Sequence, residues 1–295
     1  MIMTKPSFIL FCGCLCLFTF RETIQSFASS PSVKTSRDTP ALARSYQRLS
    51  LAQYQQGKKL VGLLNIKPKD KVLDIGCGSG ELAAYVAQFC SPQGFVLGID
   101  PSPYRIELAQ KKRAKNCYFR VASSDQLYFL PSNSFDVVYL NYVLHWIENK
   151  RQVFEEIFRL LKPGGRLGIS MGDKQQNSKV YSILMKSIHE TLGKIPSERL
   201  VTPYYISREQ LEKTAIQSGF SIDHLYVEEN IHYLSSPSKV IEFFEASDFG
   251  NFLAGIPQKT KRKIIRKMRE NLARLATPRG IEMKYRTIVF IGHKP

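Results

Sequence analysis

The segment over residues 72–80 has the composition of a ligand-binding turn. It reads VLDIGCGSG, an apolar run that leads directly into glycines at positions 76, 78 and 80. Because glycine has no Cβ, the backbone at Gly76 and Gly78 can come close to a bound molecule. A dinucleotide loop, GxGxxG, would place its third glycine where this chain has Glu81, so a pyrophosphate is the less favoured ligand.

A carboxylate ends the next apolar run. Asp100 closes the segment VLGID, about 20 residues beyond the glycines. One carboxylate has two acceptor oxygens, which can hold the paired hydroxyls of a ribose. The spacing therefore predicts a ribose contact at Asp100.

Apolar runs of strand length alternate with amphipathic runs of helix length through residues 71–171. Strands are expected at KVLDIG, FVLGID, CYFRVA, FDVVYLNYV and RLGISM, and helices at ELAAYVAQF, YRIELAQKKRA and KRQVFEEIFRLL. Such alternation gives a mostly parallel sheet with helices on both faces. The KPGG segment over residues 162–165 should end the last of these helices, because proline cannot continue it and glycine accepts the turn.

Further elements flank this core and complete the expected domain, which we place at residues 42–295. A helix over residues 42–64 precedes the first strand; helices at 178–192, 207–218, 238–245 and 258–275 and strands at 224–234 and 284–294 follow the core. Ser207, with Gln210 three positions on, has the spacing of a capping box. The prediction is an α/β fold with a doubly wound, mostly parallel sheet of seven strands, and a helical lid with acceptor-site elements over residues 172–280.

These motifs together resemble the class I S-adenosylmethionine-dependent methyltransferases. The branch is that of the small-molecule enzymes, including the ubiquinone and menaquinone, trans-aconitate, malonyl carrier-protein and juvenile hormone acid methyltransferases. The resemblance covers residues 71–171 and is carried by VLDIGCGSG, GIDPS, SSDQLYFLPSNSFDVV, VLHW and LLKPGGRLGIS. It implies a Rossmann-like fold, S-adenosyl-L-methionine as the cofactor and a small-molecule acceptor.

The same resemblance implies roles for the residues of the first two motifs. The loop formed by Gly76, Gly78 and Gly80 would face the methionine part of the cofactor. Asp74 would orient that loop, and Asp100 would hold the ribose.

Two later motifs would complete the cofactor site. The usual acid of the adenine-binding segment aligns with Ser124, which leaves Asp125 shifted by one, so either residue could make the adenine contact. Asn141 would end the fourth strand beside the sulfonium. Asp136, at the start of that strand, is interpreted as structural.

Residues around the expected acceptor position carry weaker signals. His145 and Trp146 follow the fourth strand at the carboxyl edge of the sheet, where the ligands of doubly wound folds gather. Trp146 is expected to wall the acceptor pocket; His145 is either a base or, in the interpretation we favour, a packed histidine. Ser50 and Gln53 resemble a family position that covers the cofactor and in some members touches the acceptor carboxylate, and a solvated helix face is the equal alternative.

The chemistry of methyl transfer makes few demands on the protein. Transfer from a sulfonium is an in-line displacement, so the protein mainly supplies orientation and a dry pocket. A carboxylate or other anion could accept the methyl group without a base, whereas a hydroxyl or amine would call for proton removal. No residue is identified as catalytic.

No metal site is predicted, because no two of Cys77, Cys90 and Cys117 have CxxC spacing.

The chain is strongly basic, with 42 Lys and Arg against 25 Asp and Glu and a formal charge of +17. A dense run of cations from Lys259 to Arg269 falls in the helix expected at residues 258–275. This helix could contact an acidic surface, or it could be a lid helix with solvated charges. No aromatic residues interleave the cations to stack on bases, so an RNA methyltransferase is a less favoured alternative. A non-catalytic S-adenosylmethionine-binding protein is the other alternative, since cofactor motifs alone do not establish turnover.

Residues 1–41 are expected to be a targeting leader that is removed or disordered. The apolar run over residues 8–20 is short for a membrane span and follows Lys5, as in a secretory signal peptide cut after Ala28. Residues 29–47 are rich in Ser, Thr and basic side chains, as in a transit peptide. The QSFA segment over residues 25–28 resembles the junction of bipartite plastid presequences, which would place the cut after Ser26. These signals predict an organelle, specifically a plastid, with the secretory pathway or an endomembrane as the alternative.

Overall fold

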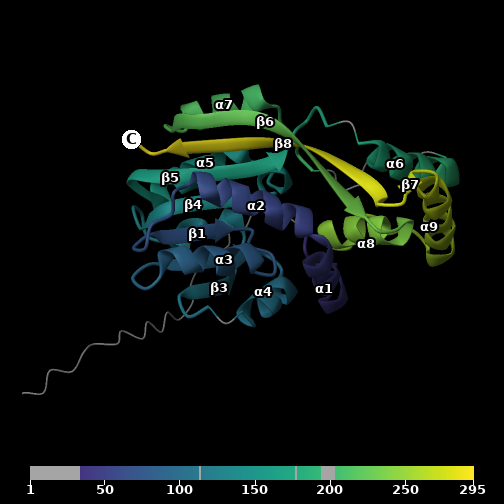
Figure 1. Ribbon diagram of the computed structural model, residues 1–295, viewed down its shortest axis with the longest axis horizontal. Helices are drawn as coiled ribbons and strands as arrows, with labels where there is room; N and C mark the ends of the chain where they lie inside the picture. The colour runs from purple at the N-terminus through teal and green to yellow at the C-terminus, as the bar shows by residue number, and fades with distance from the viewer. Residues whose placement is uncertain (1–33, 113, 177, 194–202) are drawn as a thin grey trace, which may run out of the picture. The chain divides into compact units, whose positions relative to one another are not determined.

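The computed structural model of the protein describes residues 34–112, 114–176, 178–193 and 203–295 (Figure 1). The predicted signal peptide, both candidate cleavage positions and the start of the transit-like segment lie outside these residues. Within the described part of the chain, none of the helices has the length and apolar character needed to cross a bilayer.

One mixed sheet organises the body, in the strand order β3-β2-β1-β4-β5-β8-β6, with the short β7 paired to β8. The first five strands are parallel, and β8 is antiparallel to both of its neighbours. This confirms the predicted α/β fold and adds one two-residue strand to the seven expected. The strands are β1 (Lys71–Ile75), β2 (Phe95–Asp100), β3 (Cys117–Val121), β4 (Phe135–Asn141), β5 (Leu161–Gly172), β6 (Ser221–Leu234), β7 (Ala276–Thr277) and β8 (Gly280–His293).

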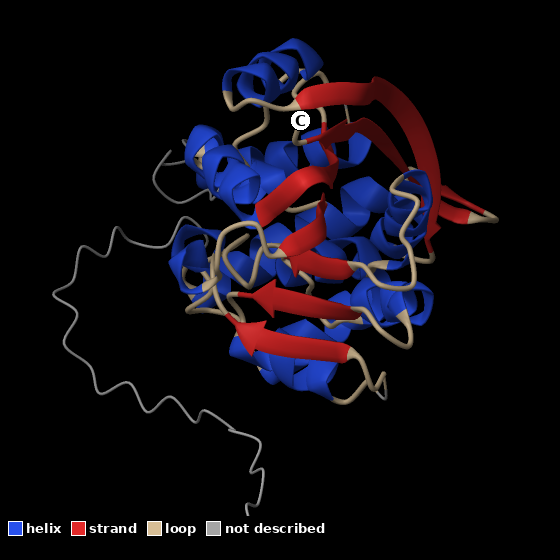
Figure 2. Cartoon of the chain, turned by 90° about the vertical axis from the view of Figure 1, so that its left-hand side faces the viewer, coloured by secondary structure: helices blue, strands red, loops and turns tan. Residues whose placement is uncertain are grey.

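Helices cover both faces of the sheet (Figure 2). One face packs on α2 (Leu51–Leu63) and α3 (Glu81–Cys90), and the other on α5 (Lys150–Leu160) and α7 (Arg208–Gln217). Strand β1 shows why helices are needed on both faces. Its Val72 packs in the core with α2 and α3, whereas Leu73 and Ile75 pack in the core with α5 and α7, so both faces of the strand are buried. The remaining helical segments are α1 (Pro40–Leu49), α4 (Pro103–Gln110), α6 (Lys179–Leu192), α8 (Pro237–Ser247), α9 (Gln258–Ala273) and the 3₁₀ turns η1 (Ser124–Phe129) and η2 (Leu144–Trp146).

The single helix predicted over residues 42–64 is wrong in two respects. The chain forms two helices that meet at Ser50, because α1 packs on α4 and α8 whereas α2 packs on α3 and the sheet. Helix α1 also begins earlier than expected, since the Thr39 hydroxyl caps the Leu42 N–H at 3.2 Å and Pro40 takes the first turn. The described fold therefore starts before residue 42.

The KPGG turn lies inside β5 rather than ahead of it. Leu161 pairs with Phe135 and Arg166 pairs with Val137, so residues 162–165 bulge out of the ladder between these two pairs. The chain's last residues close this bulge, because the Gly164 N–H donates to the Lys294 carbonyl at 2.8 Å and the Lys294 N–H to the Gly165 carbonyl at 2.9 Å. The capping box predicted at Ser207 is confirmed. The Ser207 hydroxyl accepts the backbone N–H of Gln210, and the Gln210 side-chain oxygen accepts the backbone N–H of Ser207.

A smaller core lies beyond the carboxyl edge of the parallel strands. We call its elements the cap: α6, α8, α9, β7, and the ends of β6 and β8 that run past the sheet (Figure 1). Strand β5 pairs with β8 only over residues 287–293, so the cap sits on a two-stranded extension of β6 and β8. The helices predicted for a lid at residues 238–245 and 258–275 belong to this cap, whereas α7, which also falls in the predicted region 172–280, packs on the sheet.

Candidate active site

The glycine loop joins β1 to α3 through three residues in the left-handed region. Gly76, Gly78 and Gly80 have φ values of 79°, 55° and 81°. A Cβ at Gly78 would meet one side-chain atom, of Tyr46, at 3.4 Å, so this part of the loop is open to a ligand. The backbone of the loop is held against β2, because the N–H groups of Gly76 and Cys77 both donate to the Ile99 carbonyl.

Asp74 and Asp100 lie next to the loop, at the carboxyl ends of the paired strands β1 and β2. Asp74 is 2% exposed and accepts the Tyr139 hydroxyl at 2.8 Å; burial raises the pKa of Asp74 to about 8. Asp100 accepts the N–H groups of Gly78 at 3.0 Å and Ser102 at 2.9 Å, one on each oxygen. Each oxygen keeps a second lone pair, so the carboxylate retains the capacity to accept two ribose hydroxyls.

A pocket of about 210 Å³ lies between the glycine loop and the two N-terminal helices. Residues of α1 and α2, including Tyr46, Ser50 and Gln53, line it together with Asp74, the loop and Asn141. The predicted acceptor contact of Gln53 stays a prediction. The Oε1 of Gln53 is buried without a hydrogen-bond partner among the described residues, so this oxygen has an unused capacity to accept a hydrogen bond beside the pocket.

The side chain of Asn141 is held from both sides. Its Nδ2 donates to the Gln53 carbonyl at 2.9 Å, and its Oδ1 accepts the Ser170 hydroxyl at 2.7 Å. Asn141 thus joins α2 to the end of β4 and to β5. Gly57 permits this approach, since a Cβ there would lie 2.9 Å from Asn141 Nδ2.

Ser124 and Asp125 lie outside the residues that line this pocket. They begin η1, directly after β3, and Ser123 rather than either of them caps that turn. Since β3 pairs with β2, and the Ala122 N–H donates to the Asp100 carbonyl at 3.2 Å, the turn starts beside Asp100. The adenine contact of Ser124 or Asp125 remains a prediction.

His145 is packed among the rings of Tyr142, Trp146 and Tyr205. Its ring stacks on Tyr205, with centroids 5.2 Å apart and an interplanar angle of 26°, and lies 5.2 Å from Trp146. Burial, reinforced by the nearby charge of Lys150, lowers the pKa of His145 to about 3. The imidazole is therefore neutral at physiological pH. Its Nδ1 is buried without a hydrogen-bond partner among the described residues.

Three tyrosines near His145 were not predicted from the sequence. Tyr142 has φ 57°, an unfavourable conformation for a bulky residue that costs about 1–3 kcal/mol and is typical of functional sites. Its hydroxyl shares a 2.6 Å hydrogen bond with Thr287. Burial raises the pKa of Tyr285, and the neighbouring Tyr142 and Tyr205 add to the effect, so the three phenols lie close together. They come from distant segments, and the only local signal was the position of Tyr142 directly after Asn141.

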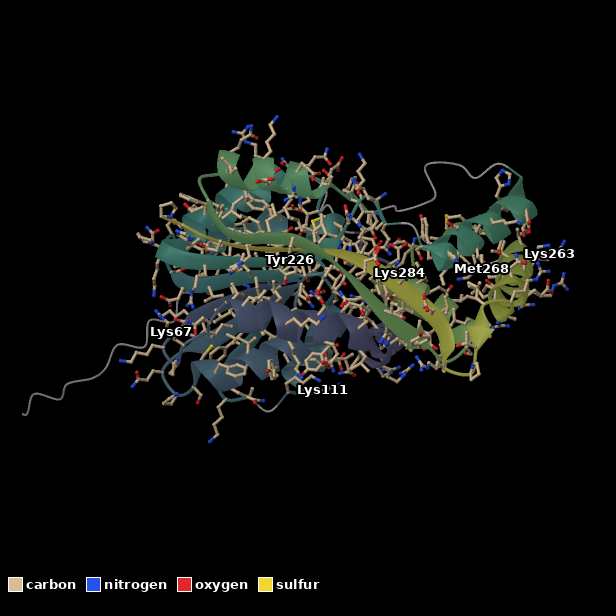
Figure 3. The ribbon with its side chains drawn as sticks, turned by 45° about the horizontal axis from the view of Figure 1, so that its top comes forward. Lys67, Lys111, Tyr226, Lys263, Met268 and Lys284 are labelled. Atoms are coloured by element: carbon tan, nitrogen blue, oxygen red, sulfur yellow. The ribbon has the colours of Figure 1, made fainter. Side chains whose placement is uncertain are left out.

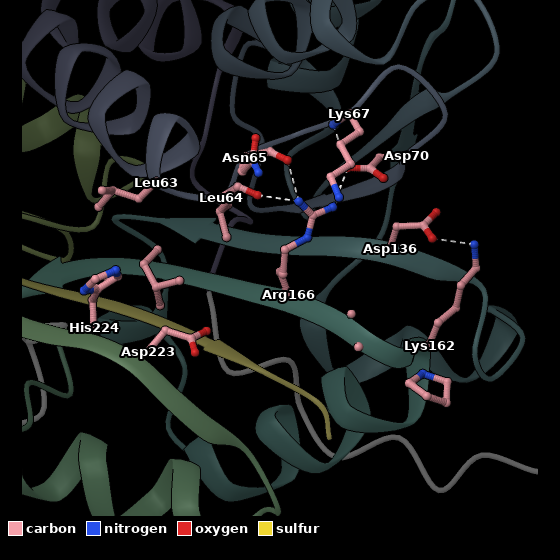
Figure 4. A pocket seen from close by; sticks show the side chains of 14 residues that line it. Leu63, Leu64, Asn65, Lys67, Asp70, Asp136, Lys162, Arg166, Asp223 and His224 are labelled. Atoms are coloured by element: carbon pink, nitrogen blue, oxygen red, sulfur yellow. Dashed lines mark hydrogen bonds and ion pairs between the residues drawn. The ribbon is translucent and has the colours of Figure 1, made fainter.

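A larger hollow of about 470 Å³ lies at the opposite edge of the sheet, where the parallel strands begin (Figure 4). Four of its charged groups form two ion pairs. Arg166 donates to the Leu64 carbonyl and pairs with Asp70, while Lys162 pairs with Asp136 at 2.6 Å. These contacts tie the strand ends together, in agreement with a structural role for Asp136. We therefore assign the functional site to the carboxyl edge.

Known proteins share the motif region and the fold. The methyltransferase domain family matches residues 73–169. The demethylmenaquinone methyltransferase of Lactobacillus johnsonii is 30% identical over 178 residues, which cover 55% of this chain and 72% of that protein. The chloroplastic 2-phytyl-1,4-beta-naphthoquinone methyltransferase of Arabidopsis thaliana is 27% identical over 68% of this chain and 84% of its own length. A structure of phosphoethanolamine N-methyltransferase 2 from Haemonchus contortus with S-adenosyl-L-methionine superposes with a TM-score of 0.55 at 22% identity, covering 87% of this chain and 57% of that one.

The chain belongs to the class I S-adenosylmethionine-dependent methyltransferases. S-adenosylmethionine is accordingly its cofactor, and two pocket residues fit it: the loop is open at Gly78, and Gln53 has an unpartnered acceptor oxygen. Asp100 and Gly80 do not line the pocket; Asp100 is buried beside it, hydrogen-bonded to Gly78, and its contact with the ribose stays a prediction. No cluster of three or more His, Cys, Asp or Glu side chains that could hold a metal ion occurs in the described part of the chain.

Proposed function

We propose that the protein transfers the methyl group of S-adenosylmethionine to a small aromatic molecule bearing an acidic hydroxyl, which reacts as its anion. The observation that carries the proposal is the buried, unpartnered Nδ1 of His145 among the rings of Trp146 and Tyr205. A neutral imidazole can accept a hydrogen bond from a hydroxyl or donate one to an oxygen anion, according to its tautomer. Flat aromatic walls suit a planar ligand.

The residues of the chain then act by position and by exclusion of water. S-adenosylmethionine supplies an electrophilic methyl group on its sulfonium. The glycine loop, Asp100 and Gln53 would bind the cofactor, and Asn141, which lines the pocket, would lie beside its sulfonium. With a pKa of about 3, His145 does not retain a proton at neutral pH, so the acidity of the acceptor decides how much anion is present. We therefore expect acidic hydroxyls to react fastest.

The names of two relatives support a ring acceptor. The Lactobacillus johnsonii protein is named for demethylmenaquinone and the Arabidopsis thaliana protein for a naphthoquinone. In the reduced form of such a ring, an ionised hydroxyl can react itself or activate the neighbouring carbon.

A carboxylate is the second candidate acceptor, favoured by the charge of +17. The cations near the aromatic residues are already engaged. Lys150, whose charge reaches His145, donates to the Ile147 carbonyl at 2.8 Å, and Arg286 pairs with Asp173 at 2.5 Å. Either cation would have to exchange a partner to bind a carboxylate.

Formation of S-adenosylhomocysteine across a panel of acceptors tests the proposal. The panel contains reduced naphthoquinones, substituted phenols of graded pKa, trans-aconitate and primary amines. We expect turnover with aromatic hydroxyls, with a rate that falls as their pKa rises. His145→Phe, which keeps a flat ring without its nitrogens, should lose turnover but retain S-adenosylhomocysteine binding. Turnover confined to carboxylates or amines would contradict the proposal.

Helix α9 of the cap has a basic outer face that could contact an acidic partner. Helix α9 buries Ile264, Met268 and Leu272 in the cap and directs its basic residues outward, as Lys263 shows (Figure 3). Its cations without an ion-pair partner among the described residues include Lys259, Arg262, Lys263 and Arg269. We propose that this face binds an anionic membrane surface, because it presents charge with no aromatic side chains for stacking on nucleic-acid bases.

Co-sedimentation with vesicles tests this contact. Each cation near an anionic bilayer contributes about 1 kcal/mol, so changing Lys259, Arg262 and Lys263 to Gln should weaken binding to phosphatidylserine-containing vesicles about 100-fold. The matched control changes three exposed lysines of the amino edge and the loop before β3, Lys67, Lys69 and Lys115, and should have little effect. Equal binding to neutral vesicles, or displacement only by RNA, would contradict the proposal.

The targeting signals support an organellar location, and we propose a plastid. One relative is named as chloroplastic. Mass spectrometry of the mature amino terminus in the native cells tests whether the leader is removed, as both the plastid and the secretory interpretations require: a start between residues 27 and 42 supports removal, and peptides from residues 8–21 in the mature enzyme would refute it.

A further inference from the structure

Arg105 is a buried cation at the cofactor side of the fold, five residues after Asp100. It is 3% exposed. Its Nε pairs with Asp38 Oδ2 at 3.3 Å, and its Nη2 donates to the Ala246 carbonyl at 2.7 Å. The guanidinium lies between two rings, 4.2 Å from the centroid of Tyr46 and 3.8 Å from that of Phe249. One side chain of α4 thus joins the residues before α1, α1 itself and the end of α8.

The partner carboxylate is as deeply buried as the arginine. The side chain of Asp38 is fully buried and also accepts the Ser102 hydroxyl at 2.6 Å. The N–H of the same Ser102 donates to Asp100 at 2.9 Å. Asp38 and Asp100 are therefore linked through Ser102, although neither carboxylate lines the cofactor pocket.

Tyr46 connects Arg105 to the open part of the glycine loop. Its ring stands over Arg105 and approaches Gly78, where a Cβ would lie 3.4 Å from it. Tyr46 also lines the pocket. The position of α1 over the cofactor pocket consequently depends on a contact with Arg105.

We propose that Arg105 is a positioning residue for cofactor binding, which holds residues 38–49 over the glycine loop and supplies a buried positive charge near Asp100. The inference rests on the assignment of Asp100 to the ribose. It concerns a residue that does not touch the reacting atoms, and it gives the segment before α1 a function in binding.

The electrostatic part of this role has a definite sign. Burial raises the pKa of Asp100; Arg105 is the largest opposing influence, and Asp38 adds to the rise. Ionisable groups from every neighbouring segment face Asp100, namely Arg105, Asp38, Asp74, Tyr46 and Cys77. Loss of Arg105 should therefore raise the pKa of Asp100, and loss of Asp38 should lower it.

Calorimetric titration with S-adenosylhomocysteine at pH 7 is the first test. We expect Arg105→Met and Asp38→Ala each to weaken binding about 10- to 100-fold, as for the loss of one charged hydrogen bond. Arg105→Lys, which keeps the charge, should be intermediate. The control is Arg120→Met, which removes an exposed arginine stacked 4.0 Å from the Phe129 ring, and should bind as the wild type does.

Two further readouts separate positioning from loss of stability. Binding of S-adenosylhomocysteine should slow hydrogen exchange in residues 40–49 of the wild type, and this protection should be lost in Arg105→Met and Asp38→Ala. The pH below which affinity falls should move upward in Arg105→Met and downward in Asp38→Ala. A variant that is merely less stable would not move these midpoints in opposite directions.

The outcomes distinguish this inference from the assignment on which it rests. A wild type that does not bind S-adenosylhomocysteine would overturn both. A wild type that binds, with Arg105→Met and Asp38→Ala equal to it in affinity or with both midpoints moving the same way, would overturn the role of Arg105 alone. If Arg105→Met does not fold, the affinity and pH midpoint of Asp38→Ala decide.

Discussion

Two glycines of α2 should respond in opposite ways to the same substitution. Gly62 faces solvent, and a Cβ added there would meet nothing within 4 Å. Gly57 is buried, and its Cβ would lie 2.5 Å from Leu82 Cδ2 and 2.9 Å from Asn141 Nδ2. Alanine in place of glycine stabilises a helix interior by about 0.5–1 kcal/mol, whereas forcing an extra methyl group into a packed core costs about 1–3 kcal/mol.

The net effects follow from these magnitudes. Gly62→Ala should gain about 0.5–1 kcal/mol, which raises the melting temperature by roughly 1–4 °C in a chain of this size. Gly57→Ala should lose about 1–2 kcal/mol, since overpacking outweighs the helical gain. It should also displace α2 from Asn141, break the 2.9 Å hydrogen bond to the Gln53 carbonyl and weaken cofactor binding.

Thermal unfolding and S-adenosylhomocysteine titration of the two variants provide the assay. Gly62→Ala is the matched control, because it makes the same change five residues away on the same helix. The close approach of α2 to the end of β4 would be refuted if Gly57→Ala were as stable as Gly62→Ala and bound the ligand equally well.

Four other outcomes are expected. Asp100→Ala should weaken S-adenosylmethionine binding by about 1.5–3 kcal/mol for each charged hydrogen bond lost, and unchanged calorimetric affinity would remove it from the site. Gly78→Val should abolish binding, because a β-branched side chain would fill the open loop and resist a φ of 55°; near-normal titration would show that the cofactor lies elsewhere. Burial lowers the pKa of His145 to about 3, so as the pH falls through 6.5 the unfolded chain takes up a proton that the folded chain does not. Between pH 6.5 and 5 the free energy of unfolding should therefore fall by about 2 kcal/mol more in the wild type than in His145→Asn. Equal urea-unfolding curves for the two proteins would contradict the burial of His145 as a neutral ring. A chain that starts at residue 42 lacks Asp38 and should bind S-adenosylhomocysteine less tightly than one that starts at residue 34; equal affinities would show that these residues do not support the site.

Local patterns identified the cofactor half of the protein because the chemistry there is contiguous in sequence. The run VLDIGCGSG contains four of the five residues of β1, the turn and the N-cap residue of α3, and Asp100 ends the strand that pairs with β1. The break at Ser50 had no such signal, since nothing in the local sequence distinguishes one long helix from two helices that pack on different neighbours.

The acceptor half was harder to predict because its residues meet only in the folded chain. Tyr142, Tyr205 and Tyr285 come from three separate segments, and each alone is an ordinary aromatic residue. Arg105 lies within the motif region, but its role depends on Asp38 and Ala246, at separations of 67 and 141 residues. Contacts between residues so far apart in the chain produce no local or periodic sequence pattern, so they could not be predicted from the sequence.

The two-stranded extension of β6 and β8 has a consequence for how such an enzyme can change its substrate. Residues 229–234 and 281–286 pair only at the cap, beyond the part of β8 that pairs with β5. The cap has its own apolar core, distinct from the two clusters that bury the parallel strands. Substitutions in α6 and α9, which lie in this separate core, can therefore accumulate with little effect on the glycine loop, whereas α8 is tied to the loop side through the contact of Ala246 with Arg105. If this part of the cap shapes the acceptor site, as the sequence predicts, the acceptor of the enzyme can change in evolution while its methyl donor stays the same.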